Sequence, residues 1–90
     1  METIKAKLIN YFDVVGNKED GFEVNNLCFE RNLELENLED QTILNSLIDC
    51  GFFNSQATLK DIEIDDLFPF IEINNASNYY PLCRLEIIED

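Results

Sequence analysis

The chain has 90 residues, of which 19 are acidic, six are lysine or arginine and none is histidine, so its formal net charge is −13. With 46% hydrophobic residues it is too apolar for an acidic disordered tail, and its length suits a single domain over residues 1–90. The charge argues against direct binding to nucleic acid or to an anionic membrane, since both demand a basic surface. No stretch approaches the ~18 apolar residues of a membrane span, and we expect no signal peptide.

The first two predicted elements are strands that pair as an antiparallel hairpin. Residues 3–15 alternate apolar and polar side chains, and the phase blurs near Leu8, which predicts either a bulge or burial on both faces. A turn at Gly16–Gly21 leads into a second strand, residues 22–36, in which leucines alternate with acidic and amide side chains. One face of this strand is therefore expected to be buried and the other to be wet and acidic. Arg31 breaks the apolar phase, which predicts a bend or an exposed rim.

A single helix is predicted after the hairpin. Asn37 is expected to cap its start, and an apolar stripe at helical spacing runs through residues 43–48. Gly51 is placed to adopt the left-handed conformation after the last turn. A helix of this length must pack on a sheet to be stable.

Three shorter strands are predicted to follow, at residues 59–65, 67–74 and 79–88. The first of them is the least defined, and Pro69 demotes part of the second to an edge or a bulge. The order β-β-α-β-β-β along the chain predicts an α+β fold, with a small antiparallel sheet and one helix packed on one face.

Three cysteines, Cys28, Cys50 and Cys83, are widely spaced, odd in number and without a CxxC pair. This is not a disulfide framework, so we expect free thiols and a cytoplasmic location. The apolar patterns around Cys50 and Cys83 predict buried side chains, whereas Cys28 falls on the polar phase of its strand. Because histidine is absent and no ligand pair has zinc-finger spacing, we predict no structural zinc and no other cofactor.

Signals of catalysis are poor. Without histidine the usual proton shuttle at neutral pH is missing, the serines lack the context of an activated nucleophile, and three glycines form no phosphate-binding loop. We therefore expect a protein that is not an enzyme.

One acidic stretch superficially matches a calcium-binding loop. Asp61, Glu63 and Asp65 alternate, and Glu72 stands at the twelfth place. The sixth place, which needs glycine in such a loop, is Asp66, and strand-like alternation surrounds it. We interpret the stretch as a solvated strand and turn and predict no metal site.

The acidic residues are unevenly distributed, since residues 1–18 carry a net charge of +1 and residues 19–90 carry −14. Alternate carboxylates on a strand lie roughly 6.5–7 Å apart, close to twice the ~3.4 Å advance per phosphate of one nucleic-acid strand. A strand that bears such carboxylates can therefore approximate a line of phosphates. The predicted partner-binding acids are Glu30, Glu34 and Glu36 on the second strand, followed by Asp61, Glu63, Asp65 and Asp66.

This pattern favours a decoy for nucleic acid: a non-catalytic inhibitor that occupies the basic groove of a DNA- or RNA-binding protein. Small acidic counter-defence proteins of phages and mobile elements are similar in size and charge, a likeness that transfers no residue roles. The alternative is a general protein–protein interaction or accessory module, whose charge serves solubility and whose outer strands can pair two copies into a homodimer. Tyr80, after the last predicted turn, is assigned to the partner surface, with cross-strand packing as its alternative.

Overall fold

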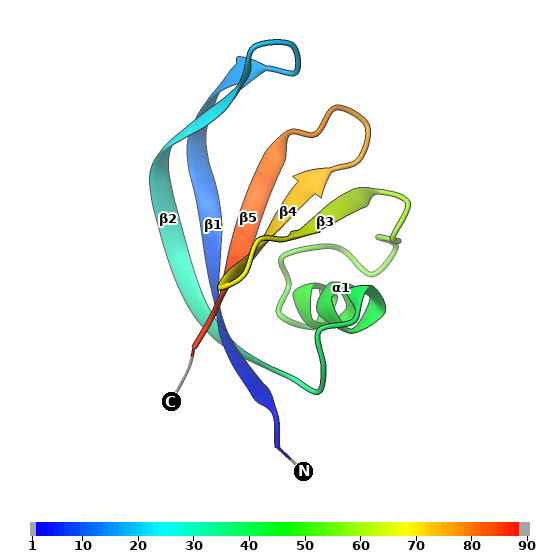
Figure 1. The fold of residues 1–90 in the computed structure, drawn as a ribbon. Coiled ribbons are helices and arrows are strands. Elements are labelled where there is room, and N and C mark those ends of the chain that lie inside the picture. Colours follow the sequence, from blue (N-terminus) through cyan, green and yellow to red (C-terminus); the bar gives the residue numbers. More distant parts are fainter. Residues whose placement is uncertain (1, 89–90) are drawn as a thin grey trace.

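Five strands and one helix make up the computed structural model, which describes residues 2–88 apart from the side chains of residues 28–30. Neighbouring strands are antiparallel, and their order across the sheet is β2-β1-β5-β4-β3 (Figure 1). The predicted α+β class is confirmed in outline, whereas the strands differ in detail from those predicted. The elements are β1 (Ile4–Asn17), β2 (Gly21–Leu35), α1 (Asp40–Asp49), β3 (Ile62–Asp66), β4 (Phe70–Asn75) and β5 (Pro81–Ile87).

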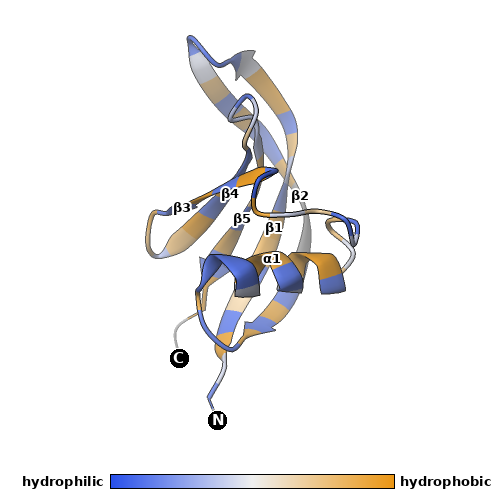
Figure 2. Cartoon of the chain, turned by 90° about the vertical axis from the view of Figure 1, so that its right-hand side faces the viewer, coloured by the Kyte–Doolittle hydropathy of each residue, from blue (hydrophilic) through white to orange (hydrophobic). Residues whose placement is uncertain are grey.

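The β1–β2 hairpin is the longest part of the sheet. The two strands pair from Ile4, opposite Leu35, to Asn17, opposite Gly21, as predicted for the hairpin. β5 pairs with β1 only between Ala6 and Asn10, so the distal half of the hairpin rises beyond the other strands (Figures 1 and 2). Phe22 of this distal arm contacts Tyr80, which precedes β5 at the same end of the sheet.

The predicted irregularity in the first strand is confirmed in both of its forms. The pairing of β1 with β2 shifts register between Ile9 and Tyr11. Leu8 and Ile9 are both buried although they point to opposite faces of the strand. Leu8 belongs to the core beneath the helix, and Ile9 is covered on the other face.

The hydrophobic core lies between α1 and one face of the sheet, which the helix crosses near the end that holds both termini (Figures 1 and 2). Ten residues are too few for a stable isolated helix, so α1 depends on this packing. Its three buried side chains are Ile43, Leu44 and Leu47. From the sheet, the buried members of the core are Ala6, Leu8, Leu35, Ile62, Ile71, Ile73, Cys83 and Leu85.

The helix boundaries correct the predicted start and confirm the predicted end. The helix begins at Asp40 with Glu39 as its N-cap residue, and Asn37 instead accepts a hydrogen bond from the Glu39 N–H at 3.0 Å. The Asn37 side chain therefore bonds to the segment before the helix and not to an N–H group of its first turn. Gly51 follows the helix with φ +87°, the left-handed conformation that the sequence predicts.

The third predicted strand starts three residues too early. β3 begins at Ile62 because residues 58–61 form a turn, in which the Asp61 N–H donates to the Thr58 carbonyl at 3.0 Å. The carboxylate of Asp61 accepts in return from the Thr58 N–H at 2.8 Å. A side chain that closes a turn cannot at the same time belong to a regular strand ladder.

The last two predicted strands also start too early. β4 begins at Phe70, since the Leu67 N–H donates to the Phe70 carbonyl across a turn that contains Pro69. β5 begins at Pro81, because Tyr79 has φ +57° and lies in the turn after β4. Alternating hydropathy alone does not separate such turn residues from the strands that they join.

Candidate partner-binding surface

The face of the sheet that α1 leaves uncovered, here named the outer face, carries a row of charged side chains. Residues that pair directly in an antiparallel sheet lie on the same face. Asp65 of β3 pairs with Glu72 of β4, Glu72 pairs with Arg84 of β5, and Arg84 pairs with Ile9 of β1. These pairings place two carboxylates and one guanidinium side by side across three strands.

A tyrosine from β1 holds the central carboxylate of this row. The Tyr11 hydroxyl donates to Oε2 of Glu72 at 3.0 Å. Burial first, and then the hydrogen bond and charge of Glu72, raise the pKa of Tyr11, while Arg84 lowers it by less. The phenol therefore remains a protonated donor throughout the neutral range, and Glu72 is fixed in one orientation.

The Arg84 guanidinium in this row contacts side chains of β5 and of the neighbouring strand β4. Arg84 forms an ion pair with Glu86 at 2.9 Å and lies over the Phe70 ring, 5.7 Å from its centre. Its Nε is buried without a hydrogen-bond partner. Glu72 therefore has Arg84 opposite it on one neighbouring strand and Asp65 opposite it on the other.

Asp65 and Glu72 form a like-charged pair that faces outward from neighbouring strands. Like charges on directly opposed residues of neighbouring strands are destabilising. Asn74 offsets part of this cost, because its side-chain amide donates to Asp65 at 3.0 Å. Asp65 and Glu72 are therefore held beside each other by hydrogen bonds, Asp65 from Asn74 and Glu72 from Tyr11.

Above this pair lies a hollow of about 250 Å³, here named the acid–aromatic hollow. It is lined by Asp65, Glu72 and Asn74 of β3 and β4, here called its floor residues. Its other lining residues, here called its wall residues, are Phe22 and Val24 of the distal hairpin arm and Tyr79 and Pro81 from the β4–β5 turn and the start of β5. The hollow thus combines carboxylates with aromatic rings from three separate parts of the chain.

Two aromatic contacts connect the hairpin arm to the opposite wall. The rings of Phe22 and Tyr80 meet edge to face with their centres 5.4 Å apart. The Nζ of Lys18 lies over the Tyr79 ring, 5.1 Å from its centre. Tyr80 therefore has the packing contact that was the alternative to its assignment as an anchor, and it keeps part of its surface exposed.

The predicted acids of the second strand lie far from this hollow. β2 and β3 are the two edges of the sheet, four strand spacings of about 4.8 Å apart. Glu34 is exposed directly opposite Lys5, and Glu36 is exposed after the end of β2. Glu30 pairs with Ile9 through the backbone, and its side chain, like that of Cys28, lies outside the described part of the chain. The two predicted groups of acids therefore do not form one continuous line.

Two of the four predicted acids near β3 accept hydrogen bonds in turns, and the other two lie on the outer face. Asp61 closes the turn before β3, and Asp66 accepts a hydrogen bond from the Phe68 N–H at 3.2 Å in the turn after it. Glu63 is exposed on β3, two residues from Asp65 and hence on the same outer face. Of the four acids, Asp65 alone lines the hollow, and Glu63 extends its negative charge along the strand.

Sequence reasoning missed the importance of Glu72 and Tyr11. Glu72 entered it only as the last position of a rejected calcium loop. A signal for the Asp65–Glu72 pair does exist, since the two residues stand at similar distances on either side of the turn around Pro69. The contact from Tyr11 has no such signal, because it joins residues 61 positions apart in the sequence.

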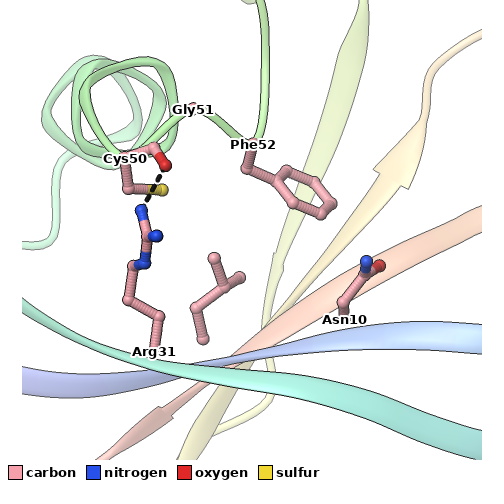
Figure 3. A pocket seen from close by; sticks show the side chains of 6 residues that line it. Asn10, Arg31, Cys50, Gly51 and Phe52 are labelled. Carbon is pink, nitrogen blue, oxygen red and sulfur yellow. Dashed lines mark hydrogen bonds between the residues drawn. The ribbon is translucent and has the colours of Figure 1, made fainter.

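A second hollow, of about 410 Å³, lies beside the C-terminal end of α1 (Figure 3). Arg31 and Cys50 line one side, and Asn10 and Phe52 line another. Nη1 of Arg31 donates to the main-chain carbonyl of Cys50, and the Cys50 thiol lies 3.4 Å from the Leu47 carbonyl. The thiol has no histidine to activate it, since the sequence contains none.

Among the side chains that the structure describes, those of residues 2–27 and 31–88, no three of the metal-binding types gather in a group that could hold an ion. In the same range, no helix has both the length and the apolar character that crossing a bilayer requires. Comparison with known protein families, with curated proteins and with solved structures found no match.

Proposed function

We propose that this protein is a non-catalytic binding protein that occupies a basic, nucleic-acid-binding surface of a partner protein and so excludes nucleic acid from it. A net charge of −13 on 90 residues attracts cationic surfaces over a distance of about one Debye length, ~8 Å at physiological ionic strength. Inhibition then follows by competition, because the occupied groove can no longer contact phosphates.

The observation that carries this proposal is that two acidic side chains oppose each other on the outer face, while several cationic side chains contact other groups of the fold. Three of the six lysines and arginines contact other groups of the fold: Arg84 pairs with Glu86, Arg31 with the end of the helix, and Lys18 with the Tyr79 ring. On the outer face Asp65 and Glu72 oppose each other, whereas Glu34 lies opposite Lys5 and Glu86 opposite Lys7. The opposed acids Asp65 and Glu72 are suited to receive a cation from another molecule.

The experiment that tests this proposal is an affinity capture from lysate with the tagged chain, eluted by a salt gradient and identified by mass spectrometry. We expect recovery of a nucleic-acid-binding protein that moderate salt releases and that added DNA or RNA displaces. Recovery of a partner that resists both salt and nucleic acid contradicts the proposal.

A second candidate function is a general interaction module that binds through apolar contacts. The β3–β4 turn favours it, since Leu67 and Phe68 are 50% and 65% exposed there. An interface built on these side chains, with a second copy or another protein, gains its stability from buried apolar area and tolerates salt. The same elution profile therefore separates the two functions.

A further inference from the structure

We propose that the acid–aromatic hollow receives one arginine side chain of the partner protein. This inference rests on the proposed function and deepens it, because it names the place on the acidic protein and the chemical group of the partner. The observations on the hollow do not depend on the proposed function: its floor residues include two opposed carboxylates, and its wall residues include aromatic rings.

The floor matches a planar cation. Asp65 and Glu72 are directly opposed on neighbouring strands, so their carboxylates repel each other. A guanidinium between them removes this repulsion and donates to both, since its five N–H groups lie in one plane in a fixed fork. Arg84 lies on the far side of Glu72 from Asp65 and forms its ion pair with Glu86.

Both carboxylates are held in position before any ligand binds. Tyr11 donates to Glu72 and Asn74 donates to Asp65, each at 3.0 Å. Asn74 is 6% exposed and Tyr11 is half-buried, so their side chains are restrained by packing. An ionised carboxylate accepts about four hydrogen bonds, so each keeps acceptor capacity for a guanidinium. This preorganisation lowers the entropy lost on binding.

The walls provide an independent indication of a cationic ligand. Lys18 already lies over the Tyr79 ring, which shows that a cation is favourable at the rim of this hollow. Phe22 and Val24 of the hairpin arm line the hollow and offer apolar contact to the methylene groups of a long side chain.

Arginine fits this site better than the other cations. Lysine presents a compact, strongly hydrated charge and lacks the planar fork of donors that can bridge two carboxylates. A calcium ion requires six to eight oxygen ligands, and the floor supplies two carboxylates and one amide that already donates to Asp65. The geometry thus points to a guanidinium.

The test uses the whole chain and a fluorescein-labelled nona-arginine peptide as the probe. Dissociation constants are measured by fluorescence anisotropy at about 0.15 M ionic strength. Two double variants remove two negative charges from different places: Asp65→Asn with Glu72→Gln in the hollow, and Glu2→Gln with Glu39→Gln at exposed positions outside it. Each amide keeps an oxygen that can accept from Tyr11 or Asn74, and thermal unfolding checks that both variants fold.

We expect the hollow variant to weaken binding about tenfold or more, and the control variant to weaken it less than about threefold. A nona-lysine peptide should bind the unaltered chain more weakly than nona-arginine does. Equal weakening by the two double variants, equal binding of the two peptides, or no binding of nona-arginine overturns the arginine site.

The proposed function is judged separately in the lysate capture. If the hollow variant and the unaltered chain recover the same basic partner with the same salt profile, the proposed function stands and the arginine site is wrong. If the hollow variant alone loses that partner, both are supported.

Discussion

Arg31 and Cys50 connect the edge strand β2 to the end of the helix, because the Arg31 guanidinium donates to the main-chain carbonyl of Cys50 (Figure 3). Arg31 pairs with Leu8 across the β1–β2 ladder and therefore lies on the face that packs against α1. Its charge lies where the helix dipole favours a cation. The predicted exposure of Arg31 is confirmed, and its guanidinium in addition contacts the end of the helix.

Replacing this arginine should destabilise the fold. Arg31→Met keeps a long aliphatic side chain but removes the donor and the charge, and we expect the free energy of unfolding to fall by about 1–2 kcal/mol. Urea unfolding followed by circular dichroism measures it. The matched control is Lys60→Met, which removes the same charge from an exposed turn residue and should change the free energy by less than about 0.5 kcal/mol. Equal losses would show that net charge, and not the helix-end contact, is responsible.

The helix should depend on its buried stripe. Leu47 is fully buried, and Leu47→Ala should lower the free energy of unfolding by about 2–5 kcal/mol through lost burial and the cavity left behind. Ile43→Val, a smaller change in the same cluster, should lower it by about 0.5–1.5 kcal/mol and remains measurable if Leu47→Ala does not fold. Leu67→Ala, at a half-exposed leucine, is the control and should have the smallest effect. A loss at Leu67 as large as at Leu47 would contradict the assignment of the core.

Stability should fall above about pH 9 because the buried Cys83 and the half-buried Tyr11 hold their protons in the folded state. Burial raises the pKa of the Cys83 thiol from its ordinary 9.0, and burial and Glu72 raise that of Tyr11 from its ordinary 10.0. The unfolded chain therefore loses these protons first as the pH rises. The stabilisation is fully present below pH 9 and declines above it.

Urea unfolding between pH 7 and pH 11 measures this decline. Tyr11→Phe removes the hydroxyl that Glu72 accepts from, so it should cost about 1 kcal/mol at pH 7. It should also make the decline above about pH 10 shallower, since the phenol no longer titrates. A variant whose stability falls as steeply as that of the unaltered chain in this range would exclude Tyr11 as a cause.

The sequence predicted those parts of the fold that depend on short-range patterns. The alternation in residues 3–15, the turn at Gly16–Gly21 and the left-handed Gly51 are all present. The strand starts were wrong at Ile62 and Phe70, because Asp61 and Asp66 bond to nearby N–H groups and so continue the turns. Such local bonds compete with strand pairing and leave no trace in hydropathy.

The candidate site could be predicted only in part, since it depends on long-range pairing. Charge and strand spacing identified Asp65 as a surface acid, but its neighbours Glu72 and Tyr79 come from β4 and the turn after it. The order β2-β1-β5-β4-β3 also separates the acids of β2 from those of β3, which alternation along each strand cannot reveal. Spatial order follows from which strands share the core, and that is decided by packing over the whole chain.

Tyr79 should be replaceable without loss of stability but with loss of binding. Its φ of +57° is a conformation that asparagine adopts more readily than tyrosine, and its side chain is half-exposed. Tyr79→Asn should therefore leave the free energy of unfolding within about 1 kcal/mol of its original value. Because the ring is lost, nona-arginine should bind about threefold more weakly. Unchanged binding in the same anisotropy assay would remove Tyr79 from the arginine site.

Lys18 competes with the partner for the rim of the hollow, and its removal should strengthen binding. Its Nζ lies over the Tyr79 ring, where a guanidinium from another molecule would also lie, and its charge repels that guanidinium. Lys18→Gln should therefore tighten nona-arginine binding about threefold. Lys60→Gln makes the same change in net charge at the exposed turn before β3 and should tighten binding less, since charges beyond about one Debye length are screened. If Lys18→Gln instead weakens binding, the prediction is wrong. Lys18 then contributes to the binding surface and does not compete with the ligand for the Tyr79 ring.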